Sequence, residues 1–189
     1  MAKKQPPETP FLNLDERNVV DKYKQLTNEE IRADLKQTAL PAAVLMLQIL
    51  GDFNISTIIR NVNFFNLSRL YYHGIKRYDR RGTVGTHHYS EVVYLPNIDD
   101  ILDLKSQYWF VGLENNIEDR PVTLGQYHWR PNSLLVIGEE GIGVPRHILN
   151  LCNDLVEIPN RGSVRSLNAG TAAGIAMFHY VEDMKEKWR

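Results

Sequence analysis

The spacing of apolar and polar positions changes at Pro41, and beyond it short apolar runs alternate with segments of helical spacing. Several runs are apolar throughout, which is typical of parallel strands buried on both faces. Alternation of such strands with helices predicts an α/β fold, a parallel sheet flanked by helices. The expected strands are residues 43–50, 70–73, 91–94, 108–113, 134–137 and 155–158.

Four helices are expected between and after these strands. Residues 56–65 follow the first strand, 98–104 follow Pro96, and 145–151 open on a proline, which is favoured in the first helical turn. Residues 167–187 form the longest helix and end in a charged, solvated turn. Its apolar stripe recurs on one face at Leu167, Thr171, Ile175, Phe178 and Val181.

Residues ahead of Pro41 have a different character. Residues 1–12 carry little apolar surface to offset the entropy of ordering, and we expect a flexible tail. Residues 13–37 show helical spacing, with a second helix start at 27–30. The sequence thus predicts a helical extension over 13–40 and one main domain over 41–189.

Composition indicates where in the cell the protein is expected. The chain of 189 residues contains no apolar run long enough to span a membrane, and its Lys- and Pro-rich start lacks the apolar stretch of a secretory signal. A single cysteine, Cys152, cannot form an internal disulfide and reads as a small core residue. We therefore expect a soluble, cytoplasmic protein without a membrane partner.

A net charge of −1 argues against an indiscriminate nucleic-acid binder, yet cations gather between residues 69 and 88. Cations, aromatics and glycines mixed in one loop suit phosphate pairing and base stacking, so RNA contact is expected; a solvated surface loop is the alternative. Two adjacent histidines on a strand would point to opposite faces, and no third ligand is evident, so no metal site is expected. The expected RNA contacts are Lys76, Arg77, Arg80, Arg81, His87 and His88.

Three segments place polar residues and glycines just after expected strands, where open α/β sheets bind ligands. In segment 52–61, Asn54 can cap the next helix and Arg60 lies one to two turns along it; a capped helix with an exposed arginine is the alternative. Segment 137–145 turns on three glycines, which permit close backbone approach, without being a Walker loop or a dinucleotide fingerprint. An ordinary strand-to-helix turn stays open there.

The third segment, 158–174, combines a glycine-containing loop with the start of the last helix. Its run of small residues permits close backbone packing, and such a run by itself indicates nothing more. That packing does not explain the polar pair Ser166 and Asn168 directly after the loop.

Taken in order, the three segments resemble the SpoU/TrmH branch of the SPOUT methyltransferases, and the resemblance spans Asn54 to Gly174. Ser56 stands where glycine is commoner, as in the tRNA-modifying TrmH group, and gives a slight lean towards tRNA. The matching positions are Asn54, Ser56, Ile58 and Arg60; then Gly138, Glu140, Gly141 and Gly143; then Ile158, Pro159, Gly162, Ser166, Leu167, Asn168, Ala172, Ala173 and Gly174.

The resemblance implies a C-terminal trefoil knot in which S-adenosylmethionine is held bent, mainly by backbone groups. It also implies a homodimer whose RNA site crosses the interface, and methylation of a ribose 2′-hydroxyl of tRNA or rRNA. The implied cofactor-binding residues are Leu113, Gly138, Glu139, Gly141, Ile158, Leu167 and Asn168.

The resemblance assigns activation of the ribose hydroxyl to Arg60, with Asn54, Glu140, Ser166 and Asn168 as positioning residues. Because an arginine has a pKa above about 12, we interpret Arg60 as an electrostatic stabiliser of the developing alkoxide instead of a base. Two alternatives from other classes stay open: a non-catalytic knotted RNA-binding protein, and a nucleotide- or phosphate-binding α/β protein. A base acceptor is a further alternative, because cofactor motifs do not identify the acceptor atom.

Overall fold

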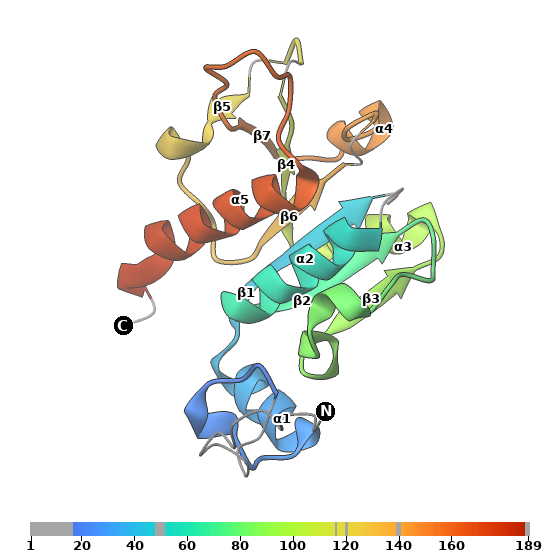
Figure 1. Ribbon diagram of the computed structural model, residues 1–189. Coiled ribbons are helices and arrows are strands. Elements are labelled where there is room, and N and C mark those ends of the chain that lie inside the picture. Colours follow the sequence, from blue (N-terminus) through green and yellow to red (C-terminus); the bar gives the residue numbers. More distant parts are fainter. Residues whose placement is uncertain (1–16, 48–51, 116, 120, 139–140, 188–189) are drawn as a thin grey trace, which may run out of the picture.

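The computed structural model describes residues 17–47, 52–115, 117–119, 121–138 and 141–187, and within them seven strands form one parallel sheet (Figure 1). The strand order is β3-β2-β1-β6-β4-β7-β5, and every pairing is parallel. The strands are β1 (Leu40–Leu47), β2 (Leu67–His73), β3 (Val92–Leu95), β4 (Trp109–Leu113), β5 (Val122–Thr123), β6 (Ser133–Ile137) and β7 (Asp154–Glu157).

Helices cover both faces of the sheet and bury an apolar layer on each. α2 and α5 lie side by side over one face, where Ile58 and Met177 pack on Met46 of β1. On the other face, Ile101 of α3 and Ile148 of α4 pack in a second core. The helices are α1 (Asn28–Thr38), α2 (Asp52–Phe64), α3 (Ile98–Asp103), α4 (Arg146–Leu149) and α5 (Ala169–Met184).

The fold class predicted from the sequence is confirmed, as are all six expected strands, with boundaries that differ by at most three residues. Residues 48–50 of the first expected strand lie outside the described residues, as does the expected tail at 1–12. β5 was not expected, because a strand of two residues leaves no periodic pattern. The trefoil knot stays a prediction from the family resemblance.

The N-terminal segment corrects the expected helix at 13–37, of which residues 13–16 are outside the described part. Residues 17–26 contain only a 3-10 turn, Asp21–Tyr23, and Gln25 has a φ of 78°, which no continuous helix accepts. Arg17 donates to the Leu26 carbonyl at 2.8 Å and thereby folds this segment back. α1 does begin as expected, since Thr27 and Glu30 form a capping box.

α1 lies beyond the end of the sheet and packs on the loop before β3 (Figure 1). Ile31 and Tyr23 form a small core with Tyr89, and Arg32 donates to the His88 carbonyl at 2.6 Å. The N-terminal segment is thereby joined to the loop that carries the basic residues.

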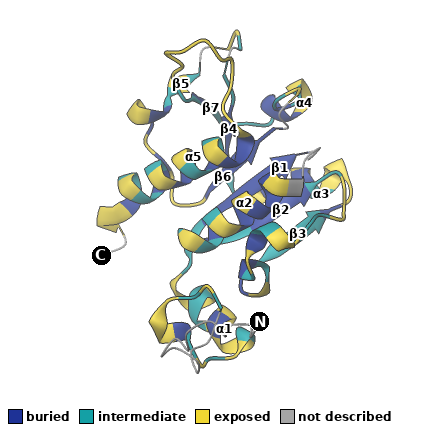
Figure 2. Cartoon of the chain, in the orientation of Figure 1, coloured by how far each residue is buried: buried dark blue, intermediate teal, exposed yellow. Residues whose placement is uncertain are grey.

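The apolar stripe of α5 faces outward, not toward the sheet. Ile175 and Phe178 are exposed, whereas small residues and Met177 form the buried face. Exposed bands run along both α5 and its neighbour α2 (Figure 2). The small residues let α5 approach the core closely, and Tyr180 and Met184 are buried on the same face, while Ile175 and Phe178 remain on the surface.

Among the described helices, none combines the length and the apolar composition needed to cross a membrane. Cys152 packs beside the second core, as expected for a small core residue, and burial raises the pKa of its thiol to about 12. The thiol is therefore not ionised at neutral pH.

Candidate functional site

A cavity of about 270 Å³ opens at the carboxyl ends of β4, β6 and β7. Open parallel sheets bind ligands at this edge. Five of the expected cofactor-binding residues line it, contributed by three strand ends and by the approach to α5: Leu113, Gly138, Gly141, Ile158 and Leu167. The predicted positioning residue Ser166 lines the same cavity.

Two glycines let the loop after β6 pack tightly against the end of that strand. A Cβ on Gly138 would lie 2.0 Å from the carbonyl carbon of Gly143 and 2.2 Å from the nitrogen of Val144. Gly143 itself has a φ of 73°, in the left-handed region that favours glycine. Two of the three glycines expected from the sequence to allow close approach, Gly138 and Gly143, are thus required by the geometry of this loop.

Glu139 and Glu140, the two acidic residues of the same loop, lie outside the described residues. Their expected contributions to the cofactor and catalytic sites therefore stay predictions.

Asn54 and Asn168 meet beside the cavity, although they are 114 residues apart in sequence. The Asn168 amide donates to Asn54 Oδ1 at 2.8 Å, while its own oxygen accepts from Thr171 N at 3.1 Å and caps α5. Asn54 does not cap α2 as expected, because the helix begins two residues earlier at Asp52. Its buried side chain instead ties α2 to the start of α5.

Close packing between α2 and α5 fixes this pair. Asn61 donates to the Gly170 carbonyl at 3.1 Å, and a Cβ on Gly170 would lie 2.9 Å from Thr57 Cγ2. The small residues of the third sequence segment therefore serve tight helix packing, as the sequence indicated. That packing holds the N-terminus of α5 at the edge of the cavity.

Arg60 lies apart from this cavity. It is exposed on α2 and lines a second hollow, about 790 Å³, between α2 and the N-terminal segment, with Tyr23 and Phe64. Within the described residues, its guanidinium has no hydrogen-bond or ion-pair partner. Its five N–H donors are thus open to an anionic or oxygen-bearing ligand.

The basic loop between β2 and β3 is anchored to α2. Ser56 is buried and donates to the Asp79 carbonyl at 2.6 Å. Arg81 is held within the loop, with its Nε 2.8 Å from Asp79 Oδ2, and it lowers the pKa of that carboxyl. The remaining expected RNA contacts line one hollow of about 800 Å³: Lys76, Arg77, Arg80, His87 and His88.

The two histidines correct a local expectation. They lie in a 3-10 turn, Thr86–His88, and their rings stack with centroids 4.0 Å apart instead of pointing to opposite faces of a strand. Burial lowers the pKa of His87, which favours the neutral form of its ring. In the described part of the chain, no group of three or more His, Cys, Asp or Glu side chains is arranged to hold a metal ion.

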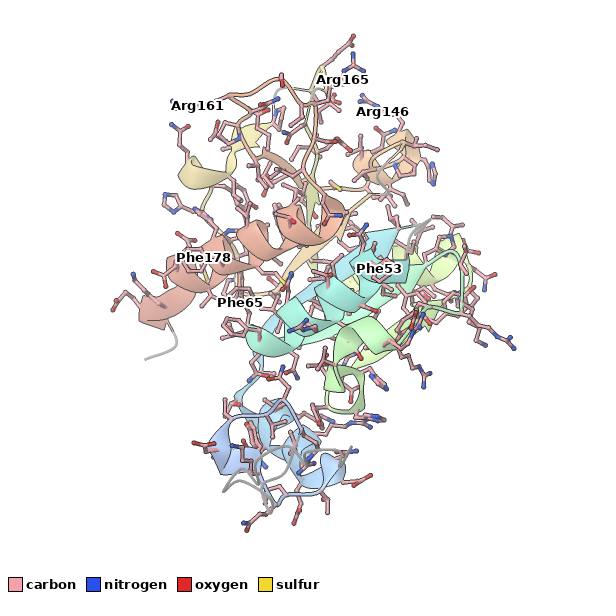
Figure 3. The ribbon with its side chains drawn as sticks, in the orientation of Figure 1. Phe53, Phe65, Arg146, Arg161, Arg165 and Phe178 are labelled. Atoms are coloured by element: carbon pink, nitrogen blue, oxygen red, sulfur yellow. The ribbon has the colours of Figure 1, made fainter. Side chains whose placement is uncertain are left out.

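Sequence reasoning missed several residues that border these sites. Glu114 and Asn115 line the first cavity directly after β4, and Arg165 lines it from the loop that leads to α5 (Figure 3). Arg32 of α1 lines the basic hollow. The position of Glu114 after an apolar strand was the one available signal, because the rule on strand ends applies there too.

A family model matches most of this chain. The model of the SpoU rRNA methylase family matches residues 41–178. This range includes every residue that lines the first cavity, and every residue that lines the basic hollow except Arg32.

Curated relatives include two 23S rRNA (guanosine-2′-O-)-methyltransferases named RlmB. The protein from Coxiella burnetii is 25% identical over 166 residues, and that from Vibrio parahaemolyticus is 27% identical over 165 residues. Each alignment covers 84% of this chain but only 65% and 66% of the respective relative. The chain therefore spans slightly less than two thirds of the length of these relatives.

Solved structures share the fold. A TrmH/SpoU tRNA modifying enzyme of A. aeolicus superposes with a TM-score of 0.74 at 22% identity, covering 85% of this chain and 83% of that one. The AdoMet complex of the SpoU methyltransferase AviRb from Streptomyces viridochromogenes gives 0.69 at 24% identity, covering 76% and 57%. Together with the family match over most of its length, these findings place the chain in the SpoU rRNA methylase family.

Proposed function

We propose that this protein transfers a methyl group from S-adenosylmethionine to a ribose 2′-hydroxyl of RNA. The observation that carries the proposal is the cavity at the carboxyl ends of β4, β6 and β7, which five of the seven expected cofactor-binding residues line. Family membership supports the same chemistry, since curated relatives are named as 2′-O-methyltransferases.

The cavity fits S-adenosylmethionine in the manner that the family resemblance implies. Leu113, Ile137 and Ile158 give it apolar walls, and the missing side chain of Gly138 lets the backbone of Gly143 and Val144 pack against the end of β6. Backbone groups near Leu113, Gly138, Ile158 and Leu167 would hold the adenosyl group. When bound, S-adenosylmethionine supplies an electrophilic methyl group to an attacking oxygen.

The residues of this chain would orient the attacking ribose and stabilise its charge. Asn54 and Asn168 fix each other through one hydrogen bond, so their remaining polar atoms are preorganised beside the cavity, with Ser166 and Glu140 as further positioning residues. Arg60 would stabilise the developing alkoxide, because its guanidinium keeps its proton at any physiological pH.

We place the RNA on the basic hollow beside β3. Four cations, Lys76, Arg77, Arg80 and Arg32, surround it, and Tyr78 adds an aromatic surface for an unpaired base. The relatives named above act on 23S rRNA and the fold neighbour on tRNA, so tRNA or rRNA is the substrate class, with a slight lean to tRNA from Ser56. We place the enzyme in the cytoplasm.

Replacing Arg77 with alanine is expected to weaken RNA binding severalfold, because one phosphate contact is lost. The slope of log K against the logarithm of salt concentration should become less steep by about 0.7 to 0.9. Filter binding over a series of salt concentrations measures both. Arg81→Ala is the matched control, since Arg81 is held by Asp79 outside the hollow and its loss should change binding little. Equal effects of the two variants would remove the basic hollow as the RNA site.

We also propose a homodimer through α2 and α5. Phe53, Phe64 and Phe178 are 77%, 82% and 56% exposed on these neighbouring helices, and Phe178 lies against Phe65 (Figure 3). An apolar surface of this kind marks a protein contact. Arg60 follows the same side of α2 as Phe64, so a dimer here would bring it to the interface and would agree with an RNA site that crosses it.

Phe178→Asp is expected to shift the protein from dimer to monomer at micromolar concentration, because the interface would bury an unpaired carboxylate. Analytical ultracentrifugation measures the change. Leu102→Asp is the control: Leu102 is a similarly exposed residue on α3, over the opposite face of the sheet. The proposed interface would be contradicted if the wild type were a monomer, or if Phe178→Asp formed a dimer as tightly as the wild type does.

Isothermal calorimetry with S-adenosylmethionine, S-adenosylhomocysteine and ATP tests the cofactor assignment. We expect both adenosyl sulfur compounds to bind with micromolar Kd and ATP to bind far more weakly. Preference for ATP would favour a nucleotide-binding α/β protein and would overturn the methyltransferase proposal.

A further inference from the structure

Glu114 stands at the end of β4 and contacts the glycine loop after β6. One carboxylate oxygen, Oε2, accepts from the backbone N–H of Val144 at 2.8 Å, and the other, Oε1, accepts from Asn115 N at 2.9 Å. The hydrogen bonds are charge-assisted, a class about twice as strong as neutral ones. Glu114 thus ties the glycine loop to the strand through its side chain.

Gly143 shows how closely the loop is held against this carboxylate. A Cβ at Gly143 would lie 2.1 Å from Glu114 Oε2, and the residue has a φ of 73°. The carboxylate therefore occupies the space that a side chain would need. Gly143 therefore allows the close approach between the loop and the Glu114 carboxylate.

Asn115 makes an equivalent contact with the other wall of the cavity. Its amide donates to the Ile158 carbonyl at 2.8 Å, and its oxygen accepts from the Ile158 N–H at 3.2 Å. Glu114 N also donates to the Val156 carbonyl at 3.0 Å, which continues the pairing of β4 with β7. Adjacent residues thus fix the loops after β6 and β7.

We infer that Glu114 and Asn115 form a clamp that positions both cofactor-binding loops. The inference rests on the proposed function, in which backbone groups of these loops hold S-adenosylmethionine. Affinity that depends on backbone groups depends on where the backbone is held, so the clamp is part of the binding site although its polar groups bond to protein. Glu114 and Asn115 are positioning residues, with no bond to the substrate assigned to them.

Glu114→Gln tests the clamp with almost no change of side-chain volume. A glutamine has one acceptor oxygen, so either Val144 or Asn115 must face an NH₂ donor where a carboxylate oxygen accepted. We expect the Kd for S-adenosylhomocysteine to rise about tenfold or more and the Val144 amide to exchange hydrogen about tenfold faster. The Kd for RNA and the melting temperature should change little. Asn115→Asp should act in the same direction, because its second oxygen would face the Ile158 carbonyl.

Glu118→Gln is the control, since Glu118 is an exposed acid in the same connection between β4 and β5. Unchanged exchange at Val144 in Glu114→Gln would overturn the clamp. Faster exchange at Val144 with an unchanged Kd for S-adenosylhomocysteine would overturn the role of Glu114 in cofactor affinity. A loss of RNA binding and cofactor binding that only follows the loss of folded protein would overturn it too. If the wild type bound no S-adenosylhomocysteine, the proposed function would fail by itself, while exchange at Val144 would still decide whether Glu114 holds the loop.

Discussion

Replacing Arg60 with alanine is expected to lower kcat for RNA methylation about a hundred- to a thousandfold. The reason is that a preorganised positive charge would be lost where negative charge develops on the attacking oxygen. Arg60 has no partner among the described residues, so its guanidinium would be available for this role without breaking another bond. Tritiated methyl transfer to RNA at saturating cofactor measures kcat.

Two further variants separate this effect from a general loss of charge. Arg60→Lys should recover part of the activity, because an ammonium keeps the charge but not the planar set of donors. Lys185→Ala removes an exposed charge near the end of α5, where Lys185 pairs with Glu182, and should leave kcat unchanged. Full activity in Arg60→Ala would exclude Arg60 from the chemistry, and the non-catalytic RNA-binding alternative predicts no activity even in the wild type.

Replacing Gly138 with alanine is expected to weaken binding of S-adenosylhomocysteine about a hundredfold. The new Cβ would lie 2.0 Å from the Gly143 carbonyl carbon, so the loop must move away from β6 and take its backbone groups out of position. Overpacking of this kind costs about 1–3 kcal/mol, and 1.4 kcal/mol is tenfold in affinity. Isothermal calorimetry gives the affinity, and circular dichroism shows whether the variant is folded.

Gly125→Ala provides a matched glycine control. A Cβ at Gly125 would have no other heavy atom within 4 Å, so the substitution meets open space. We expect cofactor affinity equal to the wild type. An unchanged affinity in folded Gly138→Ala would show that the glycine loop does not shape the cofactor site.

The sheet could be predicted from sequence because each long strand leaves its own apolar run. Val44, Phe110 and Val136 come from such runs and are fully buried. The segment at 17–26 could not be predicted, because helical spacing does not reveal that Arg17 will bond the Leu26 carbonyl or that Gln25 will adopt a positive φ. Tertiary contacts decide such segments.

The candidate site divides in the same way. Gly138 and Ser166 belong to contiguous motifs, so they could be identified from the sequence, and the resemblance gives their roles. The hydrogen bond between Asn54 and Asn168 joins residues 114 positions apart, and only the fold brings them together. Its place after an apolar strand puts Glu114 near the ligand edge of the sheet, but its contact with Val144 comes from another loop and leaves no signal in the local sequence.

Methyl transfer to a ribose oxygen can be tested most directly by mass spectrometry of nucleosides. RNA pools lacking the modification would be incubated with the protein and a donor carrying a deuterated methyl group, then digested completely. We expect a labelled 2′-O-methylnucleoside from tRNA or rRNA, formed about a hundred- to a thousandfold more slowly with Arg60→Ala. Label on a base, or no label in any RNA with protein that binds S-adenosylmethionine, would contradict it.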